Sequence, residues 1–162
     1  GRDGRTTIFD YWTVNTIRRW SNHGRFNGHQ LNAKEKELQK FYQKLLNLCN
    51  TEKAISQGEF FDLMYVNQGG WQMNEHKQYA FLRKYGKEVL LIVVNFDDIP
   101  VRVGVNIPPH AFEYLQMPVL PQCTAKELLS GKDSKVSFTP DKAFGTELPA
   151  RNGKIFKISL GK

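Results

Sequence analysis

The chain has 162 residues, of which 40% are hydrophobic and 12% aromatic, and its formal net charge is +7. This length and composition predict one globular domain, or one domain with an appendage. The longest apolar run, residues 89–94, is too short to cross a bilayer, and the lysines are scattered singly among acids rather than clustered. We therefore expect neither a membrane nor a nucleic acid as partner.

The first 57 residues are predicted to contain two helices. Residues 1–30 are typical of irregular chain with one short helix, in which Asn15 caps residues 16–20. Residues 32–50 give the clearest helical pattern, with Asn32 and Glu35 in the spacing of a capping box. Apolar side chains recur there every three or four residues and form one stripe: Leu38, Phe41, Tyr42, Leu45, Leu48 and Cys49. Such a stripe needs a partner that covers it, or it invites self-association.

Beyond Gly58 the pattern changes to that of strands. Strands are predicted over residues 59–67, 78–85, 88–96, 101–107, 134–138 and 153–160, with an ambiguous segment at 123–131 and one helical turn at 110–115. Gly86 lies in a predicted hairpin turn between the second and third strands. The fold class expected is mainly β, an antiparallel Greek-key β-sandwich of about seven or eight strands, preceded by a loop segment and one long amphipathic helix.

The sequence offers few groups for catalysis or metal binding. His23 lies among polar residues, but no nucleophile motif accompanies it. Asp97 and Asp98 end the most hydrophobic strand, where they could bind calcium, although a turn is the more ordinary role. Cys49 and Cys123 are interpreted as small hydrophobic residues rather than a disulfide or zinc ligands. We expect no cofactor in this chain.

Exposed aromatic side chains suggest a different function. Trp71 lies in a loop between two predicted strands, and Tyr65 lies shortly before it. An aromatic face can stack on a sugar ring, although a loop tryptophan more often packs on its own domain. Carbohydrate binding through such aromatics is therefore one open interpretation of the sandwich.

Several stretches resemble the C-terminal end of bacterial alpha-amylase family glycoside hydrolases. They are "DGRTTIFDYW", "IRRW", "LQKFYQKLLNL", "AISQGEFFDLMYVN", "YAFLRKYGKEVLLIVVNF" and "ELPARNGKIFKISL". The most specific are Asp3 to Trp12, Phe41 to Leu48 and Tyr79 to Phe96. The resemblance implies that residues 1–57 are the last loop and helix of a catalytic barrel, and that residues 58–162 are the C-terminal β-sandwich domain.

The resemblance also implies which functions belong elsewhere. The catalytic Asp, Glu and second Asp motifs of that family match nowhere in this chain. Asn22-His23 is similar to the family's Asn-His-Asp motif, but Gly24 stands where the aspartate should be. We therefore expect a noncatalytic part of an enzyme acting on starch or related alpha-glucans, whose partner is the barrel of the same parent chain and whose calcium, if any, is held in that parent. Arg2, Asp3, Arg5 and Trp12 would line distant sugar subsites.

Overall fold

The computed structural model describes residues 14–70 and 72–160, which form two compact units, one ending at Leu46 and the other beginning at Asn47. The helix α2 (Ala33–Thr51) starts in the first unit and ends in the second. None of the described helices has the length and hydrophobicity needed to cross a bilayer.

The first unit contains α1 (Asn15–Ser21), a turn and most of α2. The prediction that Asn15 caps α1 is wrong, because the helix begins at Asn15 and Val14 occupies the cap position without a side-chain hydrogen bond. At the other end Asn22 adopts a left-handed conformation, with φ 41°, and its side-chain amide donates to Asn27 Oδ1 at 2.8 Å. A short polar side chain tolerates this conformation better than most, so asparagine suits the stop.

The start of α2 confirms the predicted capping box. The backbone N–H of Glu35 donates to Asn32 Oδ1 at 3.0 Å, and the N–H of Asn32 donates to Glu35 Oε2, also at 3.0 Å. Two backbone donors that the helix cannot satisfy internally are thereby paired. Arg19 Nε also donates to Glu35 Oε2, at 3.1 Å, which joins α1 to the first turn of α2.

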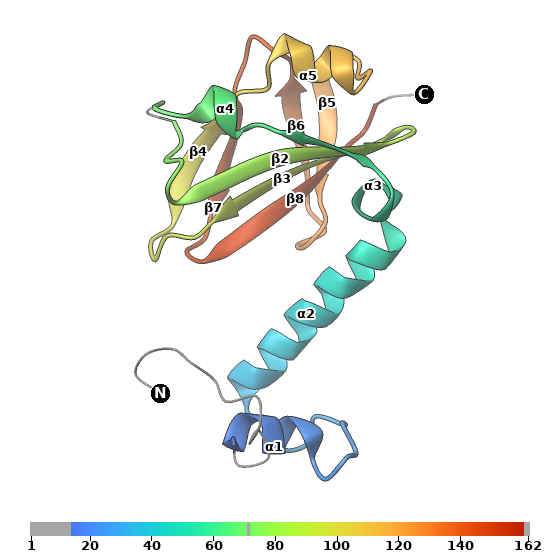
Figure 1. Ribbon diagram of the computed structural model, residues 1–162, viewed down its shortest axis with the longest axis vertical. Helices are drawn as coiled ribbons and strands as arrows, with labels where there is room; N and C mark the ends of the chain where they lie inside the picture. Colours follow the sequence, from blue (N-terminus) through green and yellow to red (C-terminus); the bar gives the residue numbers. More distant parts are fainter. Residues whose placement is uncertain (1–13, 71, 161–162) are drawn as a thin grey trace. The chain divides into compact units, whose positions relative to one another are not determined.

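The second unit is built from two antiparallel sheets (Figure 1). The larger sheet has the order β1-β2-β3-β8-β5-β6, and the smaller pairs β4 with β7. The strands are β1 (Glu59–Asp62), β2 (Gln78–Tyr85), β3 (Glu88–Asn95), β4 (Val101–Val105), β5 (Leu120–Glu127), β6 (Asp133–Phe138), β7 (Phe144–Leu148) and β8 (Asn152–Ile158). The described residues of this unit also form the short helices α3 (Lys53–Ser56), α4 (Met64–Asn67) and α5 (Pro109–Tyr114). Within the part of the chain that the structure describes, the eight antiparallel strands confirm the predicted fold class.

The hydrophobic core lies between the two sheets and under α5. Alternate residues of β3 enter it, because successive side chains of a strand point to opposite faces. These are Val89, Leu91 and Val93. Aromatic rings fill the space between elements: Phe112 lies 5.3 Å from Phe138, measured between ring centroids. The alternation predicted for residues 101–107 is confirmed, with Val103, Val105 and Ile107 buried.

The predicted hairpin is also confirmed. Tyr85 pairs with Glu88, so Gly86 and Lys87 alone form the turn between β2 and β3. Gly86 has φ +55°, a conformation that glycine adopts without a steric penalty. Local sequence thus determines the register of the two longest neighbouring strands.

Two strand predictions are corrected by the structure. The strand predicted over 59–67 ends at Asp62, and the chain then forms α4, whose first turn is held by a hydrogen bond from the Met64 N–H to Asp62 Oδ1 at 2.9 Å. The strand β7 was not predicted, because its sequence FGTEL carries apolar side chains only at Phe144 and Leu148. The ambiguous segment 123–131 lies partly in β5, followed by a turn.

Candidate functional site

An aromatic groove runs beside β1, the edge strand of the larger sheet. It has a volume of about 520 Å³ and is lined by three elements. Its lining residues are Phe60, Phe61 and Asp62 from β1, Tyr65 from α4, and His110 and Tyr114 from α5. These six residues form the aromatic groove.

Phe61 forms the centre of the groove. Its ring centroid lies 6.2 Å from that of Tyr65, 5.8 Å from that of Tyr114 and 5.6 Å from that of His110. Phe61 is only 8% exposed, whereas Tyr65 and Tyr114 are 54% and 56% exposed. A buried ring therefore supports two rings that present more than half of their surface to solvent.

The short helix α4 positions Tyr65. Besides the hydrogen bond from the Met64 N–H to Asp62, the buried Asn67 ties α4 to the end of β4. Its side-chain amide donates to the carbonyl of Asn106 at 3.0 Å, and its Oδ1 accepts from the Asn106 N–H at 2.8 Å. The same amide donates to the Leu63 carbonyl at 2.7 Å. Each of these bonds satisfies a group that burial would otherwise penalise.

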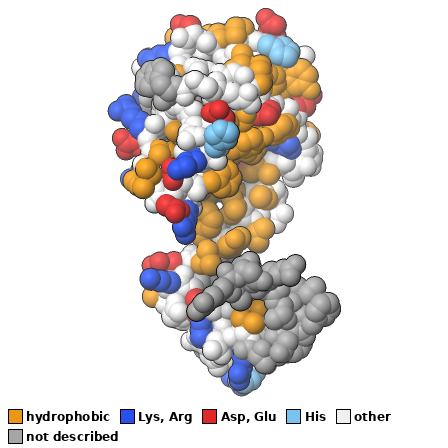
Figure 2. Space-filling view, turned by 60° about the vertical axis from the view of Figure 1, so that its left-hand side comes forward, with side chains coloured by type: hydrophobic (Ala, Val, Ile, Leu, Met, Phe, Trp, Pro, Cys, Tyr) orange, Lys and Arg blue, Asp and Glu red, His pale blue; other side chains and the backbone are white. Residues whose placement is uncertain are grey.

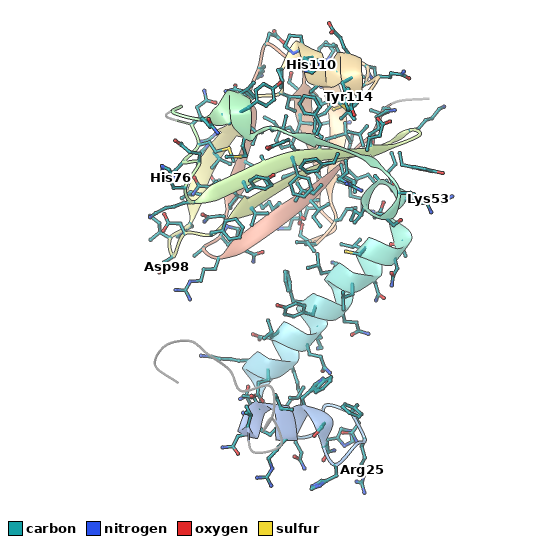
Figure 3. All side chains as sticks on the ribbon, in the orientation of Figure 1. Arg25, Lys53, His76, Asp98, His110 and Tyr114 are labelled. Atoms are coloured by element: carbon teal, nitrogen blue, oxygen red, sulfur yellow. The ribbon has the colours of Figure 1, made fainter. Side chains whose placement is uncertain are left out.

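The helix α5 positions the other two rings (Figure 3). His110 and Tyr114 are four residues apart, which places them on one side of a helix. The opposite side is anchored by buried Ala111 and Phe112. The helix ends with left-handed Gln116, and the Met117 N–H donates back to the Phe112 carbonyl at 2.8 Å, as in a Schellman motif.

The carboxylate of Asp62, which lines this groove, affects a neighbouring phenol. Burial raises the pKa of Tyr79, and the charge of Asp62 together with a hydrogen bond to it raises that pKa further. Asp62 thus contacts both the backbone of α4 and a tyrosine of β2 while it lines the groove.

A second polar cluster connects the end of α2 and α3 to the larger sheet. Lys157 Nζ on β8 lies 2.7 Å from Glu52 Oε2 and 2.5 Å from Glu88 Oε1. Glu88 Oε2 accepts from the Ala54 N–H at 2.6 Å, and Arg83 donates to the carbonyls of Ala54 and Ile55 at 2.9 and 2.7 Å. These contacts satisfy both ends of a four-residue helix.

The charges of this cluster affect one another's pKa values. Burial alone would raise the pKa of Glu88, but hydrogen bonds from Glu52, Lys157 and the Ala54 N–H outweigh it and hold the pKa at about 2. The hydrogen bond with Glu88 and burial raise the pKa of Glu52. The arrangement fixes α3 on the larger sheet, which is a structural role.

Of the predicted sugar-contacting residues, Tyr65 lies in the aromatic groove. The other predicted residues lie outside the described part of the chain: Trp71, Trp12, Arg5, Asp3 and Arg2. Sequence reasoning missed the other lining residues. The segment "HAFEY" did contain a usable signal. Its histidine and tyrosine are four residues apart, which is the spacing of neighbours on one face of a helix.

The pair of acids after β3 forms a turn, which was the more ordinary of the two roles considered. Asn95 is 1% exposed, and its side chain donates to the carbonyls of Ile99 and Pro149 at 2.9 and 3.0 Å. Asp97 pairs with Lys77 at 2.9 Å, and Asp98 pairs with Arg151. Both carboxylates therefore neutralise surface cations.

Other predicted chemistry finds no site in the part of the chain that the structure describes. Within residues 14–70 and 72–160, no three His, Cys, Asp or Glu side chains gather as metal ligands. Cys49 and Cys123 are both free thiols, as predicted, and burial raises the pKa of Cys123. His23 lies in an exposed turn with φ 56°.

The fold is similar to that of several solved structures. No protein-family model and no curated protein sequence matches the chain. Among solved structures, AmyP in complex with maltose matches with a TM-score of 0.56 and 17% identity, covering 78% of this chain and 21% of AmyP. An Anoxybacillus alpha-amylase matches at 0.53 and 18%, covering 85% and 26%. A maltogenic alpha-amylase, AmyB from Thermotoga neapolitana, matches at 0.56 and 16%, covering 81% and 27%.

The matched part is the C-terminal portion of these enzymes. The chain has the fold of the C-terminal portion of alpha-amylases. It spans only about a quarter of the length of the alpha-amylases that it matches. The similarity of fold therefore agrees with the resemblance seen in the sequence.

Proposed function

We propose that this chain is a noncatalytic C-terminal part of an alpha-amylase family glycoside hydrolase acting on starch or related alpha-glucans. Residues 1–57 would be the last loop and helix of the catalytic barrel, and residues 58–162 the C-terminal β-sandwich domain. Its role is to stabilise the barrel, and it has no hydrolytic activity of its own. The fold match to the C-terminal portion of longer alpha-amylases supports this assignment.

The apolar side chains of α2 carry the proposal. Leu38 is 58% exposed and Tyr42 is 55% exposed, and the structure buries no residue of this helix. Exposed apolar surface costs free energy, at about 25 cal/mol per Å². A 19-residue helix with such a stripe is expected to pack against a partner. In the proposed enzyme that partner is the barrel.

The second unit offers further apolar surface. After β3, Phe96 and Ile99 are 68% and 60% exposed. In Figure 2 hydrophobic side chains gather in a continuous area over the unit that carries the sheets. This surface supports a scaffold role for the sandwich as well as for α2.

Association with a barrel tests the proposal. The coding sequence on the 5′ side would be cloned, its product expressed separately, and its melting temperature measured with and without this chain. We expect the chain to raise that temperature. Leu38→Asp should weaken the effect, whereas Lys40→Asp, which places the same charge on the polar face of α2, should not.

Three results would contradict the scaffold assignment. They are a 5′ sequence that encodes no barrel with the three catalytic acids, equal behaviour of Leu38→Asp and Lys40→Asp, and hydrolysis of starch by this chain alone. Light scattering adds a simpler measurement: the isolated chain should self-associate through α2 as its concentration rises, and Leu38→Asp should reduce this.

A second candidate function is alpha-glucan binding by the sandwich. The exposed ring of Tyr65 in the aromatic groove favours it. The roles of Trp71, Trp12, Arg5 and Asp3 as sugar contacts remain part of this candidate. Calorimetry with maltooligosaccharides tests Trp71, since a saturable heat that Trp71→Ala abolishes would support a contact there, and an unchanged heat would exclude one.

A further inference from the structure

We infer that the aromatic groove is a binding site for a short alpha-glucan segment, with glucosyl rings stacked on Tyr65 and Tyr114. The sugar class rests on the proposed function, whereas the site itself rests on the geometry of the groove. The groove lies beside an edge strand and is formed by residues from β1, α4 and α5, which are up to 54 positions apart in the chain (60 to 114).

The rings offer the surface that a pyranose requires. One face of a glucosyl ring presents only C–H groups, and such a face packs well on an aromatic ring. Tyr65 and Tyr114 each contact Phe61, with centroid distances of 6.2 and 5.8 Å, so both rings have a fixed support. At about 520 Å³ the groove falls within the range of small-ligand sites.

Polar groups border these rings and can bind sugar hydroxyls. The two tyrosines carry phenolic O–H groups, His110 carries a ring N–H, and Asp62 carries a carboxylate. A carboxylate has about four acceptor positions, so Asp62 retains capacity beyond its bond to the Met64 N–H and its contact with Tyr79. A polyhydroxylated ligand uses this combination of flat apolar faces and hydrogen-bonding edges.

The groove is held in shape without a ligand. Asp62 and Asn67 fix α4, and the Schellman motif at Gln116 fixes the end of α5. Tyrosine has only two side-chain torsions, so ordering it on a ligand costs little entropy. Because the elements are already held, little binding free energy is lost to reorganisation.

The composition of the groove differs from that of the surface assigned to protein contact. The apolar stripe of α2 consists mainly of leucine and phenylalanine, whose side chains have no hydrogen-bonding groups, and Tyr42 is its one tyrosine. In the aromatic groove, four of the six lining residues have polar atoms, namely Asp62, Tyr65, His110 and Tyr114. A packed protein interface would leave such groups needing partners, whereas a sugar supplies one hydroxyl after another.

Titration of the whole chain with maltoheptaose tests the inference by calorimetry and by the ring-proton signals of the tyrosines in NMR spectra. We expect saturable binding that shifts the Tyr65 and Tyr114 signals. Tyr65→Ala and Tyr114→Ala should each weaken it by about ten-fold or more. Tyr65→Phe retains the ring and should lose less than Tyr65→Ala. Tyr42→Ala removes a tyrosine on α2 that is equally exposed, at 55%, and should leave affinity within about two-fold.

Several outcomes would overturn the inference. They are the absence of saturable binding, saturation without shifts of the two tyrosine signals, alanine variants that bind as the unmodified chain does, and equal binding of a β-linked cello-oligosaccharide. The NMR measurement needs no variant, so it decides the question even where an alanine variant fails to fold. A chain that raises the stability of a barrel but does not bind maltoheptaose would refute only the groove, and the reverse result would refute only the scaffold.

Discussion

The two units of this chain are stabilised in different ways. The unit that begins at Asn47 has a core between two sheets, with Leu82, Leu91 and Phe138 fully buried. Among the described residues of the unit that ends at Leu46, the buried side chains are those of Asn22 and Leu31. The contacts that stabilise its described residues include the capping box of α2 and the Arg19–Glu35 ion pair, in place of a packed core. Among the residues that the structure describes, burial thus distinguishes a unit with a core between its sheets from one whose exposed apolar side chains suit an outside partner.

The largest difference in stability is expected between two matched substitutions, one in each unit. Leu82→Ala removes a side chain that is 0% exposed and should lower the free energy of unfolding by about 2–5 kcal/mol. Leu38→Ala removes the same atoms where the side chain is 58% exposed and should change it by less than about 0.5 kcal/mol. Urea unfolding followed by circular dichroism measures both. A large loss in Leu38→Ala would show that α2 is covered within the isolated chain.

A smaller effect should come from the polar cluster that holds α3 on the sheet. Lys157→Met leaves Glu52 and Glu88 close together without their shared cation, at a cost of about 1–3 kcal/mol. Lys126→Met provides the control, since Lys126 is exposed and pairs with Lys157 across β5 and β8. Its removal should be neutral or slightly stabilising, because two like charges face each other. Equal losses in the two variants would mean that the cluster does not fix α3.

The pH dependence of stability should identify Glu88 within that cluster. Its pKa is about 2 in the folded chain and ordinarily 4.5, so its contribution is complete above pH 4.5 and is lost as the pH falls toward 2. Glu52 acts in the opposite direction, because a raised pKa stabilises the fold only at lower pH. As the pH falls, the free energy of unfolding should therefore decrease by about 1–2 kcal/mol less in Glu88→Gln than in the unmodified chain, after allowance for partial solvent screening.

Unfolding titrations at several pH values between 5 and 2 would measure this difference, because that range includes both the ordinary and the folded-state pKa of Glu88. Glu59→Gln is a suitable control, since Glu59 is exposed on the edge strand β1. If both variants lose stability with acid as the unmodified chain does, then carboxylates other than Glu88 govern the acid response.

Sequence reasoning predicted the features that depend on neighbours in the chain. The capping box at Asn32, the turn at Gly86 and the alternation from Val101 to Val105 each follow from local geometry, and each is confirmed. The antiparallel β fold followed from the same patterns. Strand β7 was missed because its pattern is short and weak, with two apolar side chains at its ends.

The aromatic groove could be predicted only in part. Tyr65 was singled out as an exposed aromatic, but it was expected on a strand and lies on α4. The contact between Asn67 and Asn106 ties α4 to the end of β4, and no local pattern encodes such a pair, because the two residues are 39 positions apart. His110 and Tyr114 join the groove only because α5 packs near β1. Sites assembled from distant segments depend on the tertiary fold.

The smallest effect should be confined to the first turn of α2. In Asn32→Ala the Glu35 N–H loses its acceptor at 3.0 Å, which should cost about 1 kcal/mol of local helix stability. Hydrogen exchange of the first amides of α2 should then accelerate about five-fold, while amides of β3 keep their protection, because the core of the second unit does not depend on this cap. Asn50→Ala, in the last turn of the same helix, is the control and should leave those first amides unchanged. Faster exchange in β3 as well would mean that the two units unfold together, and the contrast between a local and a core-based stability would not hold.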